Sequence, residues 1–332
     1  MPDPLVVQVM RQFKLDLLAR EQVQMQDMAK QWLGLEDALE SQIQAMADEL
    51  AREAAEGRAI SQAKLWRMRR YQSLQAQLQQ ELASYTEYAE RLIVENQSQL
   101  GAMGIQHAAM ATQVSVPGLG VHFDVLPMDV EAIENMVGLA GDGSPLKALL
   151  KTTWGDSAAG LTNELIRSTA LGINPRETAR RMRQGTTQGL NRMLNIARTE
   201  QLRVYREAGR QQYEYSGVVE GFKRLATHDG HVCPACLMAE GERYSVKQHL
   251  REHPSGRCTM VPIIRGMPEV QWEKGPEWFK RQGEATQVSI LGRGRYDAWR
   301  DGQFSLDQLV TVRKDSTWGD SVQPTPLKDL IH

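Results

Sequence analysis

The sequence has few of the residues that several common classes of protein need. Only three cysteines occur in 332 residues, and so small and odd a number argues against a disulfide framework and favours a reducing compartment. Aromatic residues make up 6% of the chain, which disfavours a β-sandwich and favours helices packed through aliphatic side chains. There is no apolar run of about 18 residues, so we expect no membrane span. We also expect no signal peptide, because the first residues lack a small-residue cleavage site.

The chain also lacks a strong excess of one charge. Its formal net charge is −2, so any surface for nucleic acid must be local. Between residues 174 and 210, however, nine arginines accompany only three glutamates. Guanidinium groups match phosphate oxygens well, whereas the few aromatic residues there disfavour base stacking. A solvated helical face is one interpretation of this stretch. The other is non-specific contact with the backbone of double-stranded DNA, through Arg180, Arg181, Arg192, Arg198 and Arg203.

Helical periodicity dominates the first third of the chain. Apolar residues such as Val6, Val9 and Phe13 recur at steps of three and four through residues 4–113, the pattern of an amphipathic helix. Gly57 is a natural stop between two runs. Two helices of about 50 residues would each span roughly 75 Å. We therefore predict a mainly α fold with a long N-terminal α-helical hairpin.

Changes in composition predict four consecutive segments. Strands are expected around the cysteines, because Val219, Phe222 and Leu225 precede them and "CTMVPII" follows them. The remaining segments read as helices. The predicted organisation is a helical hairpin or arm over 1–113, a helical middle region with Arg-rich helices over 114–215, a small α+β zinc-bound lobe with short strands over 216–265 and a helical C-terminal tail over 266–332.

All three cysteines lie within 26 residues, as Cys233, Cys236 and Cys258. The C-x2-C spacing lets two thiolates bind one tetrahedral ion from a tight turn. His253 fits best as the fourth ligand, in the pattern C-x2-C-x16-H-x4-C. A set of four protein ligands without an open position predicts a structural zinc ion that stabilises the lobe and performs no chemistry. The histidines that could replace His253 are His231, His228 and His249.

An enzymatic interpretation of the same residues is a zinc-dependent hydrolase. The segment "HLREH" (249–253) matches H-x-x-E-H, in which two histidines one helical turn apart bind zinc and the glutamate, here Glu252, is the base. Pro254 follows at once, which disfavours the helix, and the three cysteines would be unexplained. A chance match is favoured, and Glu252 is then expected to be a solvated carboxylate. The zinc deaminase pattern fails, because no H-x-E lies upstream of the cysteines.

Four sequence elements in order carry a family resemblance. They are "IARTEQLRVYREAGR", a hydrophobic strand, "DGHVCPACLMAEGERY" and "HPSGRCTMVPI". With "ILGRGRYDAWRDGQFSLDQLV" (290–310), they make residues from about 140 to 310 resemble the phage Mu F-like head morphogenesis family, the minor capsid proteins of tailed phages. The chain departs from the H-P-x-C-R-C-like close of that family, because Gly256 stands at its first cysteine-like position.

The resemblance implies a structural, non-enzymatic role in the virion. Proteins of this family are made in the host cytoplasm, join the portal protein and other capsid components during procapsid assembly, and stay inside the head. Contact with packaged or ejected DNA is inferred for them. The remaining alternative is a zinc-containing nucleic-acid-binding regulator. The sequence shows no pattern typical of a recognition helix or of the spacing between the two DNA-binding elements of a dimer.

Overall fold

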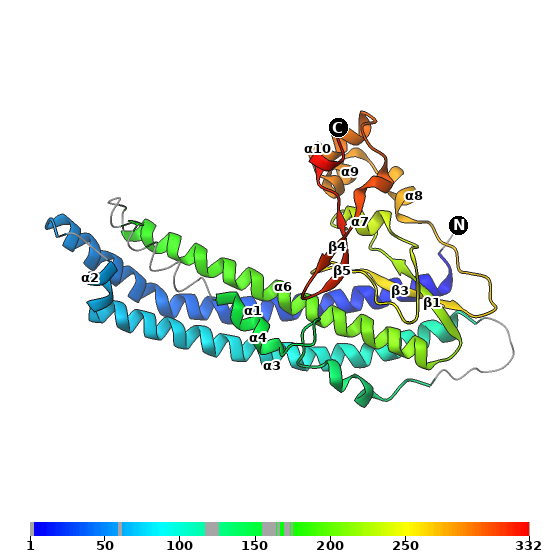
Figure 1. Cartoon of the computed structure of the whole chain (residues 1–332), viewed down its shortest axis with the longest axis horizontal. Helices are drawn as coiled ribbons and strands as arrows, with labels where there is room; N and C mark the ends of the chain where they lie inside the picture. The colour runs from blue at the N-terminus through cyan, green and yellow to red at the C-terminus, as the bar shows by residue number, and fades with distance from the viewer. Residues whose placement is uncertain are drawn as a thin grey trace. The chain divides into compact units, whose positions relative to one another are not determined.

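Long helices make up most of the chain, as its periodicity predicts. We describe the protein from a computed structural model. The longest helices are α1 (Leu5–Ala55), α3 (Arg69–Val114) and α6 (Pro175–Tyr215) (Figure 1). The prediction of a mainly α fold with a small sheet is therefore confirmed. The residues that the structure describes are 3–58, 62–116, 126–154, 164, 167–168, 173 and 175–331.

Contacts between residues divide the chain into two units, each made of stretches that are separate in the sequence. The sequence analysis instead describes four consecutive segments. Unit 1 contains Met1–Arg20, Val94–Gly143 and Arg198–His332, and unit 2 contains Glu21–Ile93 and Ser144–Ala197. Each of the helices α1, α3 and α6 has one part in unit 1 and another part in unit 2. None of the helices in the described ranges has the length and hydrophobicity needed to cross a bilayer.

In unit 2, helices α1 and α3 run antiparallel. The side chain of Gln42 donates to that of Gln77, and the hydroxyl of Tyr85 donates to the carbonyl of Met28 at 3.0 Å. Gly57 follows α1 with a φ of +74°, so the predicted stop is confirmed, because glycine adopts this left-handed conformation without a steric cost. The short helix α2 (Gln62–Arg67) precedes α3.

Aromatic side chains form the centre of unit 2. Trp32 of α1 is 1% exposed and stacks on Trp154 of the 3-10 turn η2 (Thr152–Trp154), with ring centroids 5.1 Å apart. The indole of Trp154 donates to the hydroxyl of Thr86 at 2.9 Å. Gly189 of α6 lies directly beneath that ring, where a Cβ atom would overlap it. A short helix, α4 (Leu146–Lys151), precedes η2.

In unit 1, a three-stranded antiparallel sheet has β1 at its centre. Strand β1 (Val219–Leu225) pairs with β2 (Arg243–Ser245) on one side and with β3 (Thr259–Ile264) on the other. Phe222 stacks on Tyr244 across β1 and β2, with ring centroids 5.3 Å apart. The C-terminal part of α6 covers this cluster through Tyr213, whose hydroxyl donates to the carbonyl of Met260. The expected short strands around the cysteines are thus present.

The segment predicted as a helical tail also contains a β-hairpin, which corrects that prediction. Strands β4 (Val310–Asp315) and β5 (Gly319–Pro324) pair antiparallel. The carboxylate of Asp315 accepts from the backbone amides of Thr317 and Trp318, and Gly319 has a φ of +73°. This turn chemistry, and not helical periodicity, determines the local structure. The other elements of residues 266–332 are α8 (Gly275–Lys280), α9 (Glu284–Leu291), α10 (Arg293–Arg300), η3 (Leu306–Leu309) and η4 (Leu327–Asp329). Unit 1 also contains the 3-10 helix η1 (Val130–Met136).

Candidate metal centre

The cysteines and His253 are carried by a short helix and by the loop that leads into β3. Cys233 is the N-cap of α7 (Pro234–Met238), and Cys236 lies one turn further on. Pro234 occupies the first position of this helix, where its fixed φ is favourable. Cys258 directly precedes β3 and packs with Cys236 in the apolar cluster that includes Phe279, all within unit 1.

The four predicted ligands come together in two overlapping groups. The donor atoms of Cys233, Cys236 and His253 lie within 4.8 Å of one another, and so do those of Cys236, Glu252 and Cys258. Cys236 belongs to both groups and is 2% exposed. The cluster of Cys233, Cys236, His253 and Cys258 could therefore hold a metal ion.

The imidazole of His253 is oriented as a metal ligand requires. Its Nδ1 lies 2.8 Å from the carbonyl oxygen of Pro254 and must donate to it, which leaves Nε2 as the nitrogen that can bind a metal ion once it has lost its proton. Nε2 is buried and has no hydrogen-bond partner. A hydrogen bond from the distal ring nitrogen to a carbonyl is the usual way in which proteins fix the tautomer of a ligating histidine. The residues thus fit a metal ion.

The surroundings favour the thiolate form of Cys233 and the protonated form of His253. A hydrogen bond from Cys236, followed by contact with His253, outweighs burial and lowers the pKa of Cys233 to about 5. Burial lowers the pKa of His253, but Cys233 and the charge of Glu252 outweigh it and raise this pKa to about 9. A thiolate is the form of cysteine that binds metals. The protein therefore prepares Cys233 as a ligand.

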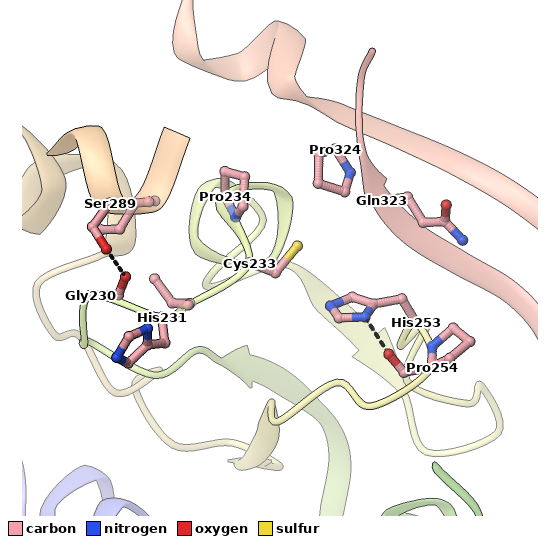
Figure 2. A pocket seen from close by; sticks show the side chains of 11 residues that line it. Gly230, His231, Cys233, Pro234, His253, Pro254, Ser289, Gln323 and Pro324 are labelled. Atoms are coloured by element: carbon pink, nitrogen blue, oxygen red, sulfur yellow. Dashed lines mark hydrogen bonds between the residues drawn. The ribbon is translucent and has the colours of Figure 1, made fainter. Parts of the chain in front are cut away.

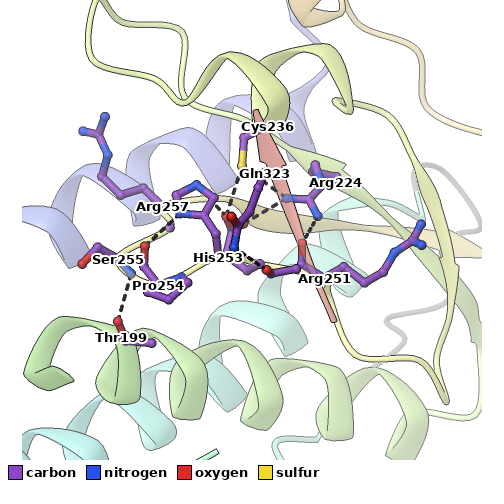
Figure 3. Close-up of polar contacts among 12 residues, drawn as sticks. Thr199, Arg224, Cys236, Arg251, His253, Pro254, Ser255, Arg257 and Gln323 are labelled. Atoms are coloured by element: carbon purple, nitrogen blue, oxygen red, sulfur yellow. Dashed lines mark hydrogen bonds and ion pairs between the residues drawn. The ribbon is translucent and has the colours of Figure 1, made fainter. Parts of the chain in front are cut away.

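A buried ion pair lies behind the cysteines and corrects one prediction. Glu252 was expected to be solvated, but it is 7% exposed, and its Oε2 pairs with Nη1 of the fully buried Arg224 at 3.0 Å. Arg224 also donates to the carbonyl of Arg251, and its Nη1 lies 3.7 Å from the sulfur of Cys236 (Figure 3). The position of Arg224 between Phe222 and Leu225 of β1 was the sequence signal for this pair, because charged residues are rarely buried without a partner.

The other histidines near the cysteines bind elsewhere. Nε2 of His228 lies 2.6 Å from the carboxylate of Glu240, and Nδ1 of His249 lies 2.7 Å from that of Glu207. His249 has a side chain that is 77% exposed, and His231 is exposed as well. Residues 249–253 form no helix. The described residues therefore do not form the two-histidine face on which the hydrolase interpretation depends.

A pocket of about 590 Å³ reaches two of the predicted ligands. Cys233 and His253 line it together with Gln323 and Pro324 of β5. Figure 2 shows the sulfur of Cys233 directed toward the side of the pocket that carries His253, while the hydroxyl of Ser289 donates to the carbonyl of Gly230 at the opposite rim. Cys236 and Cys258 are not among its lining residues. One edge of the cluster therefore faces a pocket, and the rest faces the protein interior.

Several residues of the sequence motifs contact one another around this cluster. The guanidinium of Arg257 pairs with Asp229 at 3.3 Å, and the backbone amide of Ser255 donates to the hydroxyl of Thr199 at 2.9 Å (Figure 3). Arg206 is buried and donates to the carbonyl of Gly256 at 3.1 Å. The α6 segment, the C-x2-C segment and the H-P-S-G-R-C segment thus form one structural unit.

The arginines predicted to contact DNA are engaged to different extents. Arg180 and Arg181 both pair with Glu177, at 2.6 and 2.8 Å, in the part of α6 that belongs to unit 2. Arg192, in the same part, is exposed. In unit 1, Arg198 is half-buried, and Arg203 pairs with the fully buried Glu200 at 2.7 Å. Part of the positive charge counted in the sequence is therefore neutralised within the protein.

Comparison of the chain with protein-family models, with curated proteins and with solved structures finds no match.

Proposed function

We propose that the chain is a minor capsid protein of a tailed phage, with a structural zinc ion in unit 1. In this proposal it associates with the portal protein and other capsid components during procapsid assembly in the host cytoplasm, and it is retained inside the head. Zinc is held by Cys233, Cys236, His253 and Cys258. The chain has no catalytic role, and contact with double-stranded DNA is non-specific.

The observation that carries the proposal is the convergence of the motif residues. The resemblance rests on segments that are far apart in the sequence, and these segments contact one another through Asp229 and Arg257, through Thr199 and Ser255, and through the cysteine cluster. A motif set that builds one local structure supports an architectural role, because its residues hold each other in place. Glu252, the only carboxylate in the cluster among the described residues, is paired with Arg224.

Zinc is favoured over other ions by the chemistry of the donors. Thiolate and imidazole ligands suit zinc, whereas magnesium and calcium prefer oxygen ligands. When bound, the ion would link α7 to the loop that precedes β3, since the ligands come from these two segments. Its binding free energy would then stabilise the fold of this part of unit 1.

Co-purification with the portal protein tests the proposal. The chain is co-expressed with a tagged portal protein of the same phage, and co-elution is measured for the wild type, for Cys236→Ser and for His231→Gln. We expect the wild type and His231→Gln to co-elute with the portal, because His231 is exposed and lies outside the donor groups. Cys236→Ser should lose zinc and co-elute less. A wild-type chain that folds and binds zinc but never co-elutes with the portal would contradict the proposed assembly role.

A further inference from the structure

One carboxylate oxygen of Glu252 lies among the predicted metal ligands. Its Oε1 is 3.1 Å from the sulfur of Cys236 and 3.5 Å from Nε2 of His253. A carboxylate oxygen of Glu252 also lies within 4.8 Å of the sulfurs of Cys236 and Cys258. Oε1 therefore neighbours two of the atoms that would bind the ion, and the carboxylate lies close to a third, the sulfur of Cys258.

The other oxygen of Glu252 is fixed by Arg224, which orients the carboxylate. Nη1 of Arg224 donates to Oε2, while Nη2 donates to the hydroxyl of Tyr244 at 3.0 Å and to the carbonyl of Arg251. The guanidinium is thus held at several points, and only Oε2 is turned toward it. Oε1 is left facing the cysteines.

The fold also leaves space for this carboxylate. A Cβ atom on Gly256 would overlap the side chain of Glu252 at its Oε1, Cδ and Cγ atoms. A side chain at position 256 and the carboxylate of Glu252 therefore exclude each other. The absence of a side chain at Gly256 is what allows Glu252 to reach the cluster.

Metal binding would remove the present partners of Oε1. The thiol of Cys236 donates to Oε1 now, but a ligating cysteine is a thiolate and has no proton to donate. His253 would direct its Nε2 lone pair at the ion. Oε1 would then be a buried anionic oxygen beside thiolates, an arrangement that is unfavourable unless a cation compensates it. Arg224 already holds Oε2 of the same carboxylate, so the metal ion would be the cation that faces Oε1.

We propose that Glu252 is itself a ligand of the metal ion, through Oε1, and that Arg224 is the residue that positions it. This inference rests on the zinc site of the proposed function. The ion would then have an oxygen donor in addition to the sulfurs of Cys233, Cys236 and Cys258 and the nitrogen of His253. Such a set exceeds the four donors of the usual structural zinc site.

X-ray absorption of the zinc-loaded wild-type protein tests this without any substitution. The expected spectrum needs sulfur neighbours at about 2.3 Å and both an imidazole nitrogen and a carboxylate oxygen at about 2.0–2.2 Å. Sulfur neighbours with imidazole as the single light-atom ligand would overturn the inference. It would leave the zinc site intact, whereas a chain that binds no zinc at all would instead contradict the proposed function.

Cobalt substitution provides the matched comparison among variants. With Co²⁺ in place of zinc, the visible absorption of Glu252→Gln should become stronger than that of the wild type, because loss of the extra donor leaves a tetrahedral ion, which absorbs more strongly. Competition with a chelator should show metal affinity roughly 10- to 100-fold weaker. Glu240→Gln is the control, since Glu240 is a buried carboxylate of unit 1 that binds His228 and Trp272 and belongs to neither donor group. An unchanged cobalt spectrum in Glu252→Gln would contradict the inference. If Glu252→Gln does not fold, the same spectrum is measured for Glu252→Asp, in which the shorter side chain withdraws the carboxylate from the ion.

Discussion

Three individual residues bring buried positive charge close to the cysteine cluster. Arg224 is fully buried, Arg206 is 9% exposed and Lys14 is 3% exposed. Burial lowers the pKa of Lys14 to about 8, although the nearby Cys258, Glu252 and Glu240 oppose this effect. Cations in so apolar a position need anions nearby. Thiolates bound to a divalent ion, together with Glu252, would supply them.

A second carboxylate of unit 1 makes the stability depend on pH. Burial raises the pKa of Glu207, but hydrogen bonds from His249 and Arg210 outweigh it and lower the pKa to about 2. A depressed carboxylate pKa stabilises the fold above the pKa of the unfolded chain, near 4.3, and this contribution is lost as the pH falls toward the folded value. We expect Glu207→Gln to lower the free energy of unfolding by about 2 kcal/mol at pH 7.

Denaturant unfolding of the wild type and Glu207→Gln at several pH values measures this effect. The difference between them should shrink progressively below pH 4.3 or so. Glu177→Gln is the control, because the pKa of Glu177 is also lowered to about 2, mainly by Arg180 and Arg181, yet this pair is solvent-exposed and screened. Its effect should be much smaller. A difference for Glu207→Gln that stays constant down to pH 2 would show that its cause is not ionisation.

The sequence predicted the ligands better than it predicted their surroundings. Cys233, Cys236 and Cys258 were identifiable because their clustering and spacing are rare, and His253 was favoured among four histidines by spacing alone. Glu252 was misjudged, because the segment around it is polar and gives no sign of burial. Only the register of β1, which places Arg224 beside the cysteines, brings that carboxylate inside.

At the scale of elements, close backbone contacts hold the sheet of unit 1 together. Gly221 of β1 approaches the carbonyl of Tyr244 in β2 so closely that a Cβ atom would overlap it. We expect Gly221→Ala to separate these strands and to destabilise unit 1 by about 1–3 kcal/mol. Gly34 in α1 has no atom within 4 Å of the corresponding position. Gly34→Ala should instead stabilise unit 2 by about 0.5–1 kcal/mol, since alanine is the better helix former.

Hydrogen exchange measured unit by unit distinguishes these two effects. Amides of β1 and β2 should exchange faster in Gly221→Ala, and amides around residue 34 should exchange more slowly in Gly34→Ala. Unchanged exchange in β1 and β2 would mean that the strands adjust to the added methyl group.

Helix α6 carries the arginines that we expect to contact DNA. The prediction is weak, sequence-independent binding of duplex DNA, with an affinity that falls with salt by a log–log slope of about −0.9 for each phosphate neutralised. Replacing Arg180, Arg181 and Arg192 by Gln should weaken this binding. Glu177→Gln should strengthen it, because Glu177 pairs with both Arg180 and Arg181.

Titration of a labelled duplex at low salt decides between a DNA contact and a solvated face. Equal binding by the triple variant and the wild type would reduce these arginines to a solvated or partner-facing surface. No gain in Glu177→Gln would point to a contact by other residues.

Long helices and the strands beside the cysteines were predictable as elements, whereas the C-terminal hairpin of unit 1 was not. Residues 4–113 repeat apolar positions over many turns, so α1 and α3 are legible from periodicity. The hairpin of β4 and β5 has six residues in each strand, and its turn depends on Asp315 and Gly319. Signals of this length are easily assigned to the helical segments around them.

At the scale of the whole molecule, metal binding should affect the two units differently. The proposed ligands all belong to unit 1, and the aromatic core around Trp32 and Trp154 belongs to unit 2. Removing the ion should therefore loosen the strands and short helices around the cysteines. The helices of unit 2 have their own core and should keep their secondary structure.

The zinc content of the purified chain is the direct test of the metal site in unit 1. We expect about one zinc per chain in protein purified without added metal, and less than about a third of that in Cys236→Ser. Chelation of the wild type should increase hydrogen exchange in β1 and β3 while leaving residues 21–55 of α1 protected. A wild-type chain without zinc, or a Cys236→Ser chain that retains both its zinc and its exchange protection, would contradict the account.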